Sequence, residues 1–182
     1  LHASQHSFPT RRSSDLGKLP VYQDEQFRYL TEKLNGYITG AYVYNKMGLT
    51  EQVATTITIA TPNPVRRFRF KNLDIECVKA YCMVYPDESL VPYLRLLDAI
   101  KDMKRIPGTT GQDIYNRVKS QYFNGYSLPE LEKIVSLAKS YPPRVRKVVA
   151  DILGDIRQTV LQTEMAKTIL PTTRFNLDYK TA

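Results

Sequence analysis

Hydrophobic and polar residues alternate with a period of two between residues 55 and 60. Ile57 and Ile59 are separated by threonine, and β-branched residues in this alternation are typical of a strand with one buried face. Pro62 and Pro64 follow, and we expect them to end the strand because proline cannot donate to a strand ladder.

The next segment, VRRFRFKNLDIECV, predicts a β-hairpin with Lys71-Asn72 as its two-residue turn. One face of this hairpin is then apolar, and the other carries two pairs of opposite charge. A slip of one residue would place phenylalanine opposite aspartate, so we expect a well-defined register. The expected cross-strand pairs are Phe70 with Leu73, Arg69 with Asp74, Phe68 with Ile75 and Arg67 with Glu76.

A short helix is predicted ahead of the first strand, over residues 40–47. Thr39 is its expected N-cap. Gly48 is its expected stop, because only glycine adopts the left-handed C′ conformation without a steric penalty. A longer helix, Asp24 to Leu34, precedes it, with the residues before Asp24 expected to be extended.

After residue 86 the period changes to that of helices. Ser127 and Glu130 fit a capping box at the start of one of them. The fold class predicted is α+β: a small antiparallel β-hairpin sheet with a capped helix, followed by a bundle of about four helices. The predicted helices cover residues 89–106, 111–123, 128–138 and 144–154, the last with a weaker continuation over 156–169.

The first sixteen residues, LHASQHSFPTRRSSDL, have no helical or strand period. They resemble a translated sequencing adapter, so we expect them to be non-native and to lie outside the fold. Both histidines, His2 and His6, belong to this segment. The expected organisation is segment 1–16, a β-containing half over 17–86, a helical half over 87–170 and a tail over 171–182.

The chain is basic, with a net charge of +8, and without residues 1–16 the charge is +7. A net positive charge favours association with polyanions such as DNA. No run approaches 18 apolar residues, so no membrane span is predicted. Cys77 and Cys82 are the only cysteines; we interpret them as core thiols of a cytoplasmic protein, and expect no metal and no cofactor.

Few residues here are suited to catalysis. The chain has no histidine after residue 16, no G-x-S-x-G sequence and no P-loop. Asp74 and Glu76, two apart on one strand face, are a candidate Mg²⁺ pair of a nucleotidyltransferase-like enzyme. The hairpin register gives both acids arginine partners, Arg69 and Arg67, so the salt-paired interpretation is favoured.

Three segments carry a family resemblance: TGAYVYNKMGLTEQV, TTITIAT and RRFRFKNLDIE. Together they resemble the C-terminal antitoxin domain of the AbiEi family, the antitoxins of bacterial abortive-infection (type IV toxin–antitoxin) systems, which are also described as transcriptional regulators. The resemblance runs from about residue 19 to about residue 156 and is strongest over 38–81. It contains no catalytic signature.

The resemblance implies a non-enzymatic antitoxin and autoregulator that acts in phage defence. The family's DNA-reading winged helix-turn-helix lies upstream of this domain, so we expect it to be missing from this chain. Operator DNA is then the expected partner, bound mainly through the missing domain. A nucleotidyltransferase-like toxin is the functional partner, and type IV systems do not require direct contact with it.

Basic residues are the candidate DNA contacts. One group lies on the hairpin and the other opens the predicted helix over 144–154, where cations oppose the helix dipole. A third interpretation is a protein-interaction module that docks through an exposed apolar patch on the helical half. The candidate phosphate contacts are Arg66, Lys71, Arg144, Arg146 and Lys147.

Overall fold

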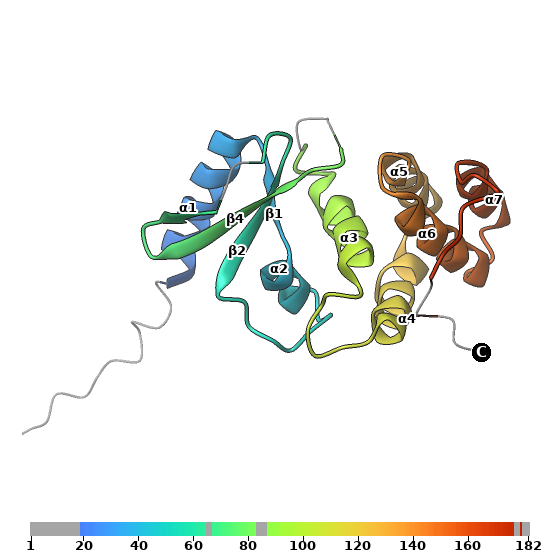
Figure 1. Ribbon diagram of the computed structural model, residues 1–182, viewed down its shortest axis with the longest axis horizontal. Coiled ribbons are helices and arrows are strands. Elements are labelled where there is room, and N and C mark those ends of the chain that lie inside the picture. The colour runs from blue at the N-terminus through green and yellow to red at the C-terminus, as the bar shows by residue number, and fades with distance from the viewer. Residues whose placement is uncertain (1–18, 65–66, 83–86, 177–178, 180–182) are drawn as a thin grey trace, which may run out of the picture.

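A computed structural model describes residues 19–64, 67–82, 87–176 and 179 of the protein (Figure 1). The described chain is α+β, with a four-stranded mixed sheet in its first half and five α-helices in its second. In order, the elements are α1 (Leu19–Leu34), β1 (Tyr37–Thr39), α2 (Ala41–Lys46), β2 (Thr56–Thr61), β3 (Phe68–Phe70), β4 (Leu73–Lys79), α3 (Val91–Asp102), α4 (Gly111–Gln121), the 3₁₀ turn η2 (Phe123–Gly125), α5 (Leu128–Ala138), α6 (Pro143–Asp155) and α7 (Thr159–Lys167).

The strand order is β1-β2-β4-β3. β1 pairs antiparallel with β2, and β3 with β4, but β2 and β4 are parallel and align Ile57 with Ile75. The predicted antiparallel hairpin is present, but the sheet around it is mixed and not antiparallel throughout. The chain leaves β2 for the outer strand β3 and turns back as β4, so β4 enters beside β2 in the same direction. The alternation of apolar and polar side chains within β2 or β4 does not show that the two strands are parallel neighbours.

The sheet lies between α1 on one face and α3 on the other (Figure 1). Tyr37 and Ala60 face α3 and belong to the core that the sheet shares with the helical half. Ile38, their neighbour on β1, points to the α1 side. The buried cluster on that side comprises Phe27, Leu30, Ile38, Val43, Ile57, Ile59 and Ile75.

The hairpin of β3 and β4 forms in the predicted register. Phe68 and Phe70 are partly buried and pack against the cluster under α1, so the aromatic face of the hairpin points into the protein. Lys71, in the turn, has φ 54°, the left-handed conformation that two-residue hairpin turns favour.

The sequence predicted Thr39 as the N-cap of α2, and that prediction is wrong. Thr39 is the last residue of β1, and Gly40 occupies the N-cap position. The Thr39 hydroxyl donates to Asp98 on α3 at 2.9 Å, and α2 begins two residues later at Ala41. The predicted stop of this helix is confirmed, because Gly48 has φ 68° and Leu49 behind it is fully buried. The sequence did not reveal β1 because three residues are too few to show a period.

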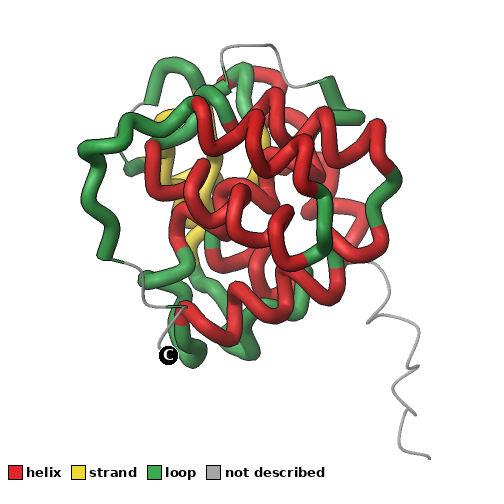
Figure 2. Tube along the Cα trace, turned by 90° about the vertical axis from the view of Figure 1, so that its right-hand side faces the viewer, coloured by secondary structure: helices red, strands yellow, loops and turns green. Residues whose placement is uncertain are grey.

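Figure 2 shows helices in front of the strands, and the helices of the second half, α3 to α7, share one buried cluster with the sheet. The helical half contains one more helix than predicted, because Arg157 has φ 62° and separates α7 from α6. The Ser127–Glu130 capping box is confirmed: the Ser127 N–H donates to Glu130 Oε2 at 2.8 Å.

The first described element, α1, begins at Leu19. The lead-in before Asp24, which was predicted to be extended, is therefore helical. Among the described helices, none has the length and apolar character needed to cross a membrane.

Tyr179 docks against the helical half. Its hydroxyl donates to Asp151 of α6 at 3.0 Å, and its ring stacks on Tyr115 of α4 with centroids 4.7 Å apart. The side chain is only 1% exposed. This residue of the predicted tail is therefore part of the core.

Candidate functional site

The charged face of the β3–β4 hairpin brings the two acids and two arginines together. Arg67 donates twice to Glu76 Oε1, from Nη2 at 2.7 Å and from Nε at 3.2 Å. Arg69 Nε lies 4.0 Å from Asp74 Oδ1, with both side chains about 70% exposed. Within the described residues, no group of three or more His, Cys, Asp or Glu side chains is placed to hold a metal ion.

Of the hairpin residues predicted to contact phosphate, Arg66 lies outside the described residues. Lys71 is exposed, and its Nζ lies 5.7 Å from the centroid of the Phe70 ring. It borders a shallow pocket with Glu25 and Tyr29 of α1. Lys71 therefore remains at the surface, beside an acidic neighbour.

Most cations of the second predicted basic group, at the start of α6, contact other residues of the protein. Arg146 Nη1 donates to the Thr168 carbonyl after α7, and Lys147 Nζ lies 2.6 Å from Asp151 Oδ1. Arg144 is partly buried, with Nε and Nη2 lacking a hydrogen-bond partner in the described part of the chain. Figure 1 places α6 and the hairpin at opposite ends of the molecule, so the two basic groups do not form one surface.

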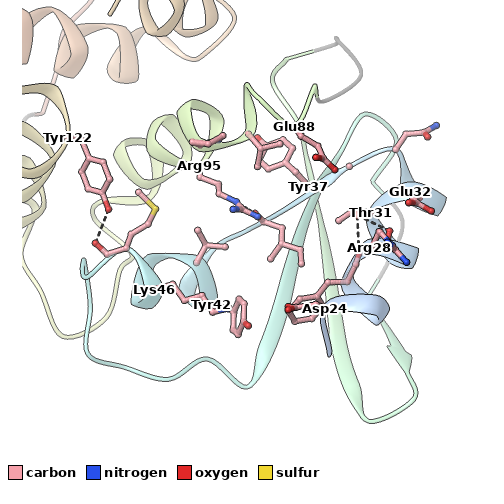
Figure 3. A pocket seen from close by; sticks show the side chains of 18 of the residues that line it. Asp24, Arg28, Thr31, Glu32, Tyr37, Tyr42, Lys46, Glu88, Arg95 and Tyr122 are labelled. Carbon is pink, nitrogen blue, oxygen red and sulfur yellow. Dashed lines mark hydrogen bonds between the residues drawn. The ribbon is translucent and has the colours of Figure 1, made fainter. Parts of the chain in front are cut away.

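A groove of about 880 Å³ lies between α1, β1, α2 and α3 (Figure 3). We call it the Arg95 groove. Its walls are largely apolar and aromatic, with charged side chains reaching in from three helices. Residues that define it include Phe27, Ile38, Tyr42, Val43, Val91 and Arg95.

Arg95 projects from α3 toward β1 in the middle of this groove (Figure 3). Its Nε donates to the Ile38 carbonyl at 2.8 Å, which fixes the guanidinium at the edge of the sheet. The side chain is half-buried, and burial lowers the pKa of Arg95, while the neighbouring Tyr37 and Tyr42 oppose that shift. No carboxylate pairs with Arg95 among the residues that the structure describes.

Behind the groove, a buried carboxylate joins the sheet to the helices. Asp98 Oδ2 accepts hydrogen bonds from the hydroxyls of Tyr37 and Thr39, each at 2.9 Å. Asp98 Oδ1 accepts from Tyr141 at 3.2 Å and from Lys101 at 3.3 Å. Burial raises the pKa of Asp98, and Lys101 counteracts the rise. The wall of the groove formed by β1 and α3 is thereby held in place.

Sequence reasoning did not single out Arg95 or Asp98. Both lie on the amphipathic stretch that predicted α3, where a charged residue is normally assigned to the solvent face. A signal was present, because Arg95 stands between Leu94 and Leu96 and Asp98 stands between Leu97 and Ala99, all four of which are buried.

The cysteines are a partly buried Cys77 and a buried Cys82, which are not joined in a disulfide.

In the helical half, three large apolar side chains are exposed among the described residues. Leu128 starts α5, Val160 lies in the first turn of α7, and Leu170 follows α7.

No family model, curated protein or solved structure matches this chain.

Proposed function

We propose that this chain is the C-terminal part of a non-enzymatic antitoxin and transcriptional autoregulator of the AbiEi type. The proposal starts from the resemblance over residues 38–81. The described residues of that stretch form the sheet β1 to β4 and the helix α2, packed between α1 and α3. Such a unit suits a scaffold that presents a surface to partners.

One observation carries the non-enzymatic part of the proposal: the two arginines lie against the two acids. An enzyme of the nucleotidyltransferase kind needs Asp74 and Glu76 free to hold Mg²⁺ with their carboxylate oxygens. Here Glu76 accepts two hydrogen bonds from Arg67, and Arg69 is the nearest cation to Asp74. The pairing supports a structural role for these acids.

The DNA-binding part of the proposal assigns sequence reading to a winged helix-turn-helix upstream of this domain. The basic domain described here would add contacts to phosphate, which strengthen binding without reading sequence. Among the candidates that the structure describes, Lys71, at the tip of the hairpin, is the exposed one.

A gel-shift titration tests this proposal. The full-length gene is recovered and its product is titrated against DNA from upstream of its own operon, at salt concentrations from about 50 mM to 200 mM. We expect binding that weakens steeply with salt. Lys71→Ala should reduce the slope of log K against log salt by about 1, the effect of one lost phosphate contact.

Lys133→Ala, which removes an exposed cation from α5, is the matched control and should leave the slope unchanged. A full-length protein that does not bind operon DNA even at the lowest salt would contradict the autoregulator assignment. Co-expression with the neighbouring toxin gene tests the antitoxin role separately, since growth should be restored whether or not the two proteins form a complex.

A further inference from the structure

The Arg95 groove has the size and lining of a small-molecule site. Ligand pockets typically enclose about 300–1,000 Å³ and are lined by apolar and aromatic side chains with few polar groups. This groove encloses about 880 Å³, and Phe27, Ile38, Val43 and Val91 supply apolar surface. A molecule with an apolar body of several rings or a short chain therefore fits.

Charge within the groove is asymmetric in depth. The border of the groove carries both signs of charge on exposed residues: the carboxylates of Asp24, Glu32 and Glu88, and the cations of Arg28 and Lys46. Arg95 is half-buried at the centre. A half-buried cation without a carboxylate is costly unless an anion accompanies it. The position where a negative charge would be stabilised is thus inside the groove, at Arg95, beyond the charged residues of the border.

The geometry of Arg95 suits an anion with two oxygens. Its Nε is engaged by the Ile38 carbonyl, and within the described residues neither Nη has a protein partner. The two Nη groups can donate side by side, the arrangement that binds a carboxylate or phosphate in bidentate fashion. The hydrogen bond to Ile38 already orients the guanidinium, so binding of an anion costs less side-chain conformational entropy.

The aromatic wall beside Arg95 completes the site. Tyr42 packs edge-on against Phe27, with centroids 5.4 Å apart. Lys46 Nζ lies 4.6 Å from the centroid of the Tyr42 ring, which adds a second cation at the same side of the groove. Figure 3 shows Tyr42 and Lys46 together below Arg95.

We propose that the Arg95 groove binds a small organic anion, a carboxylate or phosphate group on an apolar body, with the anionic group on Arg95 and the body against Tyr42 and Phe27. This site goes beyond the proposed antitoxin function and does not depend on it.

A displacement experiment on the whole chain tests the site. Anilinonaphthalene sulfonate, a fluorescent organic anion, is bound to the protein and then displaced by naphthoate, naphthyl phosphate or the uncharged naphthalenemethanol. We expect at least one of the two anions to compete about tenfold more strongly than the alcohol, a factor typical of a charged hydrogen bond. Comparing naphthoate with naphthyl phosphate distinguishes the two anionic groups.

The variants assign that preference to Arg95. Arg95→Leu should abolish the preference for the anions, and Arg95→Lys, which keeps the charge but loses the fork, should weaken it severalfold while retaining the fold. Arg105→Leu, which removes an exposed arginine after α3, should leave it intact. Thermal melts check folding, and Arg95→Lys decides the outcome if Arg95→Leu does not fold.

Three results would overturn the site: no binding of the fluorescent anion by the wild-type protein, equal competition by the alcohol and the anions, or a preference for anions that is undiminished in the Arg95 variants.

Discussion

Asp98 is the residue on which the join between sheet and helices depends. The residue is 1% exposed, and its carboxylate accepts hydrogen bonds from three hydroxyls and one ammonium group. A buried charge is tolerated when it is paired and fully hydrogen-bonded, and removing one partner leaves the others unsatisfied. The four donors come from β1, α3 and the segment between α5 and α6, so the carboxylate holds three parts of the chain together.

Replacement of Asp98 by alanine should lower the free energy of unfolding by about 3 kcal/mol, because several buried donors lose their acceptor. Urea denaturation at neutral pH measures the loss. Asp74→Ala is the matched control: its carboxylate is exposed and only loosely paired, so it should cost at most about 1 kcal/mol. Equal losses in the two variants would contradict the role given to Asp98.

The same variant has a pH signature. Because burial raises the pKa of Asp98 above its ordinary value of 3.8, the folded state binds this proton more tightly than the unfolded chain does. The resulting stabilisation is complete below pH 3.8 and is lost as pH rises through the folded-state pKa. The stability difference between wild type and Asp98→Ala should therefore shrink as pH rises from that value. A difference that grows with pH would show that the pKa of Asp98 is lowered instead.

At the scale of elements, β1 is the short edge strand that the sequence did not reveal. It follows Gly36, where a Cβ atom would lie 2.3 Å from the Ala60 carbonyl oxygen of β2. A non-bonded carbon and oxygen atom cannot approach that closely, so the close approach of β1 to β2 requires glycine at this position. The edge matters to the Arg95 groove, because Ile38 of β1 supplies the carbonyl that orients Arg95.

Gly36→Ala should therefore push β1 away from β2 and lower the free energy of unfolding by about 1–3 kcal/mol, the usual cost of overpacking. Gly125→Ala offers a control within the same chain, since a Cβ there meets nothing within 4 Å. It should be neutral or stabilise by less than about 1 kcal/mol. Urea denaturation of both variants decides the matter, and a neutral Gly36→Ala would mean that β1 is not packed as described.

At the scale of the whole molecule, α3 belongs to both halves. Its Asp102 accepts a hydrogen bond from Tyr44 of α2 at 2.8 Å, while Tyr141 from the helical half reaches Asp98. One continuous buried cluster runs from the sheet through α3 to α7. We therefore expect the described chain to unfold as one cooperative unit.

Tyr179 extends that unit to the end of the described chain. Tyr179→Phe should cost about 1 kcal/mol, because it removes the hydrogen bond to Asp151 but keeps the stacked ring. Tyr179→Ala should cost about 3–5 kcal/mol, because it also leaves a cavity beside Tyr115. Tyr29→Phe, at a half-exposed position on α1, should change little. Thermal unfolding monitored by circular dichroism measures all three, and a Tyr179→Ala variant as stable as wild type would mean that the tail is not docked.

The sequence by itself determined the features that are local. Alternation fixed β2, and the hairpin register followed because a slip of one residue would bury Asp74 or Glu76. The glycine at 48 and the Ser127 capping box marked helix ends, since these signals act within one turn of backbone. Each of these features depends on residues that lie close together in the chain.

Tertiary structure decided what depends on distant partners. The parallel pairing of β2 with β4 and the existence of β1 arise from burial against α1 and α3, which no local period records. Thr39 lies on β1, and its hydroxyl donates to a carboxylate 59 residues away. The groove around Arg95 exists only where α1, β1, α2 and α3 meet. Apolar neighbours of Arg95 and Asp98 were visible in the sequence, but the groove and the hydrogen-bond partners of these two residues come from distant segments.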